Sequence, residues 1–171
     1  MRSQSRGFAL AHTERAVVAI RVVSSLAWLQ SALVGADAKW SPAFLSGAGL
    51  TQRITGTFVH TALAPWIARA LQSVVVPHAQ LFAVLLAVCD LAIGISLFLG
   101  LFTRLGAALE ILRCLVNVAI AGGAGADTIG FNVMLATAGA IALATGAGRR
   151  AGIDAFLLRS RPRARGLRLF A

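Results

Sequence analysis

Charged side chains are scarce in this chain: Asp, Glu, Lys and Arg together make up 13 % of its 171 residues. Soluble domains carry roughly 25 % charged residues, because polar groups must cover the surface that faces water. Hydrophobic residues reach 58 %, and the few charges leave long stretches of chain almost uncharged. This composition excludes an ordinary soluble domain and indicates one membrane domain.

Motifs for covalent, metal or phosphate chemistry are also missing. Cys89 and Cys114 lie inside apolar runs without a CxxC pair, so we expect inert thiols rather than a disulfide framework. The sequence has no phosphate-binding loop, nucleophile elbow or metal-ligand spacing. His12, His60 and His78 lie outside every predicted spanning helix, which argues against a transmembrane bis-histidine haem. We therefore expect no metal site.

Acidic residues are few as well, six against sixteen Lys and Arg, which gives a net charge of +10. The basic residues flank apolar runs, and no aromatic platform lies between them, so we expect no nucleic-acid partner. Seven arginines lie near the C-terminus: Arg149, Arg150, Arg159, Arg161, Arg163, Arg165 and Arg168. A basic tail beside a membrane attracts anionic lipid by about 1 kcal/mol per residue, so we expect anionic lipids as partners of this tail.

Four segments are long and apolar enough to cross roughly 30 Å of hydrocarbon as helices. They cover residues 16–36, 79–101, 105–122 and 129–147. A tight turn at Phe102, Thr103 and Arg104 makes the second and third helices antiparallel neighbours, and a Gly-rich stretch at 122–125 joins the third to the fourth. The sequence thus predicts an all-α, four-transmembrane-helix bundle over residues 1–171, with a basic tail at 148–171.

The distribution of basic residues predicts an orientation in the membrane. With four crossings, both termini and Arg104 share one side, and that side carries most of the arginines. The other side carries Lys39, Arg53 and Arg69. Because cytoplasmic loops are enriched in Lys and Arg, we expect both termini in the cytoplasm.

The connection between the first two spans, residues 37–78, contains an amphipathic stretch between Pro65 and Pro77. Its polar face holds Arg69, Gln72 and Ser73, and its apolar face Ile67, Leu71 and Val74. This pattern predicts a short helix in the membrane interface, with Trp40 and Trp66 as anchors at headgroup level. An ordered loop is the alternative interpretation.

Four ionisable residues fall inside the predicted spans: Arg21, Asp90, Glu110 and Arg113. Ionisable groups in hydrocarbon face the bundle interior and pair with one another, and the formal charges of these four sum to zero. Glu110, Arg113 and Asn117 lie on one helix face, as do Arg21, Ser25 and Trp28 on the first helix. We expect both faces to meet each other and Asp90 in one polar cluster.

This cluster has two competing interpretations. It is either a closed network that holds the helices in register, or the lining of a pocket for a polar headgroup such as that of a quinone. In the second case, Asp90 and Glu110 are candidates for proton relay, because carboxyl groups in low dielectric exchange protons with a reduced carrier. Arg21, Trp28, Arg113 and Asn117 are then candidate contacts of the quinone headgroup. A transport path is the third alternative.

Residues 77–107, PHAQLFAVLLAVCDLAIGISLFLGLFTRLGA, resemble the DoxX/DoxD family of small four-helix bacterial membrane proteins. Family members show a proline before this helix, an acidic residue followed by a glycine, and an "LGLFTR" exit, which correspond here to Pro77, Asp90, Gly94 and residues 99–104. The ending GAGRRAGIDAFL at 146–157 and the first helix, with Arg21 leading to Lys39, are also similar to the family. The chain departs at Asp90, where members usually carry glutamate, so its carboxylate is one methylene shorter.

The resemblance implies a bacterial inner-membrane protein in a redox setting, since the family includes the small subunit of thiosulfate:quinone oxidoreductase. We therefore expect a membrane subunit of a respiratory or redox complex that contacts quinone and other membrane subunits, and no covalent cofactor. A non-catalytic accessory subunit and a small oligomeric transporter remain as alternatives, because a fold supports many functions.

Overall fold

The computed structural model describes residues 2–35, 38–150 and 152–160, and within them every regular element is a helix. Four long helices form the bundle: α1 (Arg2–Leu33), α6 (Ala79–Leu99), α7 (Thr103–Ala121) and α8 (Ala126–Thr145). By length and hydropathy, these helices provide four segments able to cross a membrane. The prediction of an all-α protein with four spanning helices is confirmed. Part of the predicted basic tail, residues 161–171, lies outside the described residues.

The ends of the spanning helices lie within a few residues of the predicted ones, except that α1 begins at Arg2 and not at residue 16. Helix α6 ends at Leu99, and the positive φ of 66° at the following Gly100 takes the chain out of the helix. Phe102 follows with φ 50°, and α7 begins at Thr103, so the predicted turn at 102–104 is displaced toward the N-terminus. The predicted Gly-rich connection at 122–125 contains the short 3₁₀ helix η4 (Gly122–Ala124).

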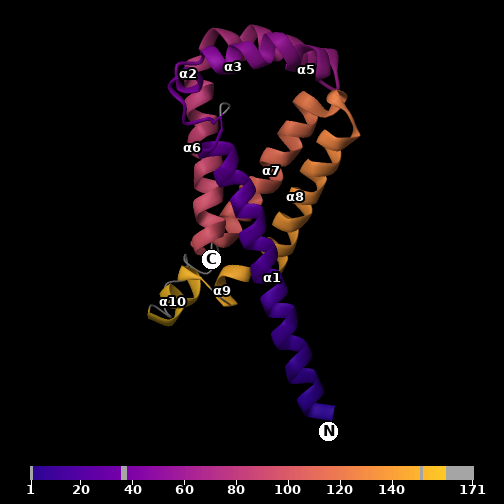
Figure 1. Ribbon diagram of the computed structural model, residues 1–171, viewed down its shortest axis with the longest axis vertical. Coiled ribbons are helices and arrows are strands. Elements are labelled where there is room, and N and C mark those ends of the chain that lie inside the picture. Colours follow the sequence, from indigo (N-terminus) through magenta and orange to yellow (C-terminus); the bar gives the residue numbers. More distant parts are fainter. Residues whose placement is uncertain (1, 36–37, 151, 161–171) are drawn as a thin grey trace.

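The bundle is built on a hairpin of α7 and α8, and α1 packs along α6 and crosses α8 (Figure 1). Apolar side chains on the outer faces of these helices are at least half exposed; they include Val23, Leu26, Leu85, Leu115 and Met134. Such a continuous apolar exterior is costly in water and is matched by lipid. The chain is therefore a multi-pass membrane protein that associates with the bilayer through these faces.

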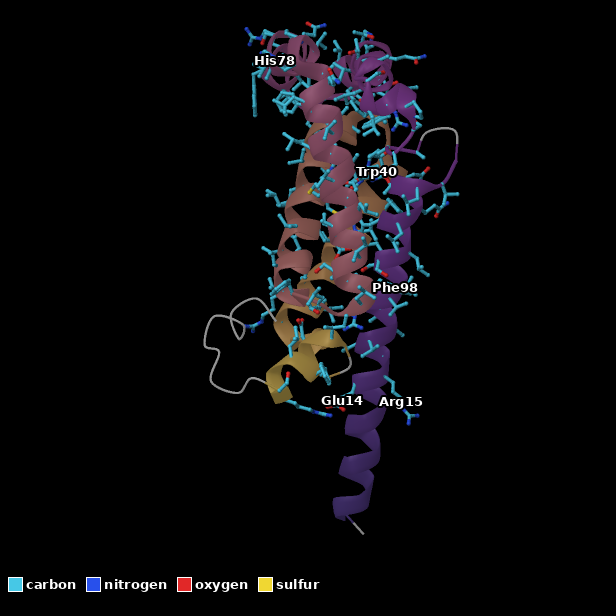
Figure 2. All side chains as sticks on the ribbon, turned by 90° about the vertical axis from the view of Figure 1, so that its left-hand side faces the viewer. Glu14, Arg15, Trp40, His78 and Phe98 are labelled. Atoms are coloured by element: carbon cyan, nitrogen blue, oxygen red, sulfur yellow. The ribbon has the colours of Figure 1, made fainter. Side chains whose placement is uncertain are left out.

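The connection between α1 and α6 lies across one end of the bundle and is more helical than predicted (Figure 1). Its first half contains α2 (Pro42–Leu45), α3 (Ala48–Arg53), the π-helix η1 (Ile54–Phe58) and α4 (Val59–Thr61). Its second half contains α5 (Pro65–Ala70), the π-helix η2 (Leu71–Val75) and the 3₁₀ helix η3 (Val76–His78). The second half confirms the helix predicted between Pro65 and Pro77. We call this end, where Trp40 and His78 lie in Figure 2, the connection end.

The opposite end carries α9 (Ala147–Arg150) and α10 (Ile153–Ser160) beside the lower part of α1 (Figure 1). The buried carboxylate of Asp154 accepts hydrogen bonds from the backbone N–H groups of Phe102 (2.8 Å) and Thr103 (3.0 Å). It thereby caps the N-terminus of α7, where N–H groups have no partner within the helix. The tail helix thus fixes the turn between α6 and α7.

Candidate functional site: a buried ion cluster beside an inner cavity

Asp90, on α6, is fully buried and is paired with two cations. Its Oδ1 accepts a hydrogen bond of 3.1 Å from Nε of Arg113, on α7. Its Oδ2 forms an ion pair with the ammonium group of Lys39. A buried carboxylate needs such partners, because a charge out of water is otherwise strongly destabilising. The predicted contact between Asp90 and Arg113 is present.

Lys39 reaches this position because the chain folds back after α1. Gly35 has a φ of 94°, a conformation that favours glycine, and the N–H of Lys39 then bonds to the carbonyl of Ser31 at 3.4 Å. The Lys39 ammonium also donates to the hydroxyl of Ser31 at 2.8 Å. Lys39 lies in the connection that follows α1, as predicted, but its side chain is buried and joins the end of α1 to α6.

Burial lowers the pKa of Lys39 below its ordinary value of 10.5. The charge of Asp90 opposes this shift, because it favours the ammonium form, and the charge of Arg113 adds to it. The side chain is thus a cation that gives up its proton more readily than an exposed lysine.

Arg113 connects the ion cluster to the polar face of α7. Its NH1 group donates to the amide oxygen of Asn117, one helical turn further on. This contact confirms that Arg113 and Asn117 share one face and interact, as expected for residues four apart in a helix.

An inner cavity of about 400 Å³ lies beside this cluster, between the connection helices and α6, α7 and α8. Its polar wall is formed by Lys39, Arg53, Arg113, Asn117, Thr128 and Asn132. Its apolar wall is formed by Phe44, Leu50, Ile54, Phe58, Leu71, Val75, Phe82, Leu86, Val116, Ile120 and Ala121. Small-molecule sites have volumes of roughly 300 to 1,000 Å³ and combine an apolar lining with a few polar groups. The inner cavity matches this description.

Glu110 forms a separate contact away from the inner cavity. Its Oε1 accepts a hydrogen bond of 3.0 Å from the indole N–H of Trp28, on α1. Its Oε2 is buried and has no hydrogen-bond partner among the residues that the structure describes. Gly139, on α8, leaves room for it: a Cβ at that position would lie 2.8 Å from Oε2. Neither Glu110 nor Trp28 is among the residues that line the inner cavity.

Arg21 lies nearer the α10 end and does not join the cluster around Asp90. Its NH1 group donates to the carbonyl of Ala147 at 3.3 Å. The carboxylate of Asp154 attracts the positive charge of the Arg21 guanidinium group. The prediction of a single cluster of Arg21, Asp90, Glu110 and Arg113 is thus wrong, although all four side chains are buried as predicted. The side chains bind different partners: Arg21 binds the Ala147 carbonyl, Glu110 binds Trp28, and Arg113 binds Asp90.

A family model described as DoxX matches residues 44–123, which include the ion-pair partners Asp90 and Arg113. Over this range, which is just under half of the chain, the sequence is DoxX-like. No curated protein and no solved structure matches it. The matched range contains most of the inner cavity's lining but excludes Arg21, Trp28, Lys39 and the tail helices.

Two of the segments that resemble the family, 99–104 and 146–157, contact each other in the structure. The N–H of Asp154 bonds to the carbonyl of Gly100 at 2.9 Å, and a Cβ on Gly152 would lie 2.9 Å from the α-carbon of Gly100. The glycines at these positions therefore permit a close backbone approach that places the Asp154 cap. Sequence reasoning missed Asp154, and the signal that could have found it is the glycine–acid spacing of the tail.

The cysteines and the other metal-ligating side chains are the remaining candidates for a site. Cys89 and Cys114 are free thiols, one half-buried and one buried. Among the described residues, no group of three or more His, Cys, Asp or Glu side chains is placed to hold a metal ion.

Proposed function

We propose that this DoxX-like protein is the membrane subunit of a quinone-linked redox complex and that its inner cavity binds the quinone headgroup. The observation that supports this most strongly is the position of Lys39 and Arg113, which belong to the polar wall of a cavity whose other wall is apolar and aromatic. A quinone has this same division, because two carbonyl oxygens sit on an apolar ring and tail.

Several residues of this chain would have distinct roles in binding the quinone headgroup. Arg113 and Asn117 orient a carbonyl oxygen by donating hydrogen bonds. Lys39 holds a proton at the cavity wall, and Asp90, which contacts the same ammonium group but does not line the cavity, stabilises the charged form. A bound quinone would supply the transfer of two electrons and two protons. Trp28, Glu110 and Arg21 are proposed to position α1 against α7 and α9 and not to contact the headgroup.

Titration of the purified protein with a short-chain quinone tests this assignment. We expect Lys39→Met to weaken binding roughly tenfold, the effect of losing one charged hydrogen-bond donor. Arg113 still neutralises Asp90 in this variant, so the fold is retained. The matched control is Arg69→Met, because Arg69 is an exposed cation on α5 outside the inner cavity. Equal quinone affinity in wild type and Lys39→Met would refute the assignment.

One observation favours a second candidate, a non-catalytic accessory subunit that stabilises a larger membrane assembly. The charge of Asp90 is already fully compensated by two cations within the chain, as in a purely structural cluster. This alternative predicts no quinone binding at all, together with loss of the partner subunits from the purified complex when the bundle is destabilised.

The placement in the cell follows from the charge distribution. We propose the bacterial inner membrane, with both termini in the cytoplasm, because the side that carries the termini and Arg104 holds most arginines. We also propose that the basic tail contacts anionic lipid. Phe156 on α10 is 70 % exposed and would insert into the membrane interface.

A further inference from the structure

A second hollow, which we call the outer groove, lies on the connection helices. It has a volume of about 530 Å³ and is lined by residues of the segment 41–58. Gln52, Gly56 and Thr57 line it and are exposed. Since this segment lies across the connection end of the bundle (Figure 1), the outer groove lies at that end.

The outer groove and the inner cavity share three lining residues: Phe44, Arg53 and Phe58. The guanidinium carbon of Arg53 lies 5.5 Å from the centre of the Phe44 ring, a cation–π contact. The side chains of Phe44, Arg53 and Phe58 therefore lie between the two spaces.

The backbone beside these side chains is unusual. Arg53 directly precedes η1, a π-helix that contains Phe58, and a second π-helix, η2, contributes Leu71 and Val75 to the inner cavity. π-Helical turns are rare and occur frequently at functional sites. Gly56 within η1 is exposed and has no neighbouring atom within 4 Å of where a Cβ would lie.

The opposite side of the ion cluster is closely packed. Ile93 and Leu97 on α6 and Ala107 on α7 are fully buried, and they belong to one hydrophobic cluster that continues toward the α10 end. Close-packed apolar side chains leave no passage for a hydrated molecule. Among the described residues, packed core thus lies between the ion cluster and the α10 end, whereas toward the connection end the inner cavity borders the outer groove at Phe44, Arg53 and Phe58.

We propose that Arg53, resting on Phe44, gates a hydrophilic route from the outer groove to the inner cavity and that this route admits water and small anions. The positive charges of Arg53, Lys39 and Arg113 along the route favour anions over cations. Water and small anions therefore reach Lys39 from the connection side of the membrane. The proposal concerns access alone and stands whether or not the inner cavity binds a quinone.

Thiol labelling in sealed vesicles tests the route. In a background in which Cys89 and Cys114 are replaced by alanine, Asn117→Cys places a thiol on the wall of the inner cavity, and Asn132→Cys is a second variant on α8. The probe is a membrane-impermeant, negatively charged methanethiosulfonate added to one side at a time. Ser73→Cys and Ser160→Cys, both exposed, mark the connection side and the α10 side.

We expect the thiol at 117 to react from the side on which Ser73→Cys reacts. Arg53→Ala should speed this reaction roughly fivefold, the size expected when one cation–π contact no longer holds the route closed. Arg69→Ala, which removes an exposed arginine outside both spaces, should leave the rate unchanged. Labelling from the Ser160 side, or equal rates with and without Arg53, would overturn the proposal. So would thiols that react only with a membrane-permeant maleimide.

Discussion

Lys39 and Asp90 form a buried ion pair although 51 positions separate them in the sequence. The pair links the chain that returns from α1 to the middle of α6. Because Arg113 binds the same carboxylate, two cations share one acid, and the cluster carries one net positive charge beside the inner cavity. Substitutions in this cluster should therefore change the stability of the fold and the pKa of Lys39.

Asp90→Asn should destabilise the fold strongly, by about 3–5 kcal/mol, because it leaves Lys39 and Arg113 buried without a counter-ion. The free energy of unfolding can be measured by denaturant titration in detergent micelles. The matched control is Asp127→Asn, which changes an exposed acid on α8 and should have an effect within about 0.5 kcal/mol.

Adding Lys39→Met to Asp90→Asn should restore part of that lost stability, because one of the two uncompensated charges is removed. If Asp90→Asn unfolds at the same denaturant concentration as wild type, the ion cluster contributes nothing to the fold and its described geometry is wrong.

Lys39 is the chain's one lysine, so ¹³C-lysine labelling yields a single side-chain NMR signal. Its titration should give a pKa below the ordinary 10.5, since burial disfavours the charged form. Asp90→Asn should lower this pKa further, because the Asp90 charge raises it. Between the folded and unfolded pKa values, the unfolded chain binds more protons, so stability should increase as the pH rises through that window. A folded-state pKa at or above 10.5 would contradict this account.

Trp28→Phe should destabilise the protein by about 1–3 kcal/mol, because Oε1 of buried Glu110 loses its donor. Trp28→Phe and Glu110→Leu should be coupled in a double-mutant cycle by about 0.5–3 kcal/mol, measured from unfolding in detergent. Strictly additive effects would show that the two side chains do not interact. Quinone affinity should be unaffected in the Trp28→Phe variant, since Trp28 lies outside the inner cavity.

Asp154→Ala should cost about 1 kcal/mol or more through loss of the cap on α7. Hydrogen exchange supplies a local readout: the backbone N–H groups of Phe102 and Thr103 should exchange faster, while those in the middle of α7 stay protected. Unchanged exchange at Thr103 would mean that α10 does not hold this turn.

Gly94→Ala should destabilise the bundle by about 1–3 kcal/mol, because the added Cβ would lie 2.8 Å from the Leu29 side chain of α1. Gly130→Ala, on α8, meets no atom within 4 Å and should be neutral or stabilising by up to about 1 kcal/mol. Comparing the two variants distinguishes the effect of helix–helix contact from that of helix propensity. Equal changes in unfolding free energy would exclude close packing of α1 on α6.

The spanning helices could be predicted because their signal is local. Apolar runs of sufficient length give the four helices directly, and the cost of charge in hydrocarbon correctly predicts that Arg21 and Glu110 turn inward. The partners of these side chains could not be predicted in the same way. Which turn of α1 meets which helix depends on crossing angles, and these are set by packing of the whole bundle.

The buried position of Lys39 could not be predicted from the local sequence pattern. By sequence it follows the first span and belongs to a polar connection, but the turn at Gly35 returns the chain along the end of α1 and buries its side chain. Asp154 is a similar case, since its capping contact with Thr103 joins residues 51 positions apart. Neither contact follows from periodicity or composition.

The lysine signal also offers the most direct test of the central claim, that the wall formed by Lys39 and Arg113 receives a quinone headgroup. The ¹³C-labelled protein is titrated with a short-chain quinone while the Lys39 signal is recorded. We predict that the signal shifts progressively and saturates, and that the same titration of Asn117→Leu requires a higher quinone concentration. A Lys39 signal that stays in place while the protein demonstrably binds the quinone would contradict the claim.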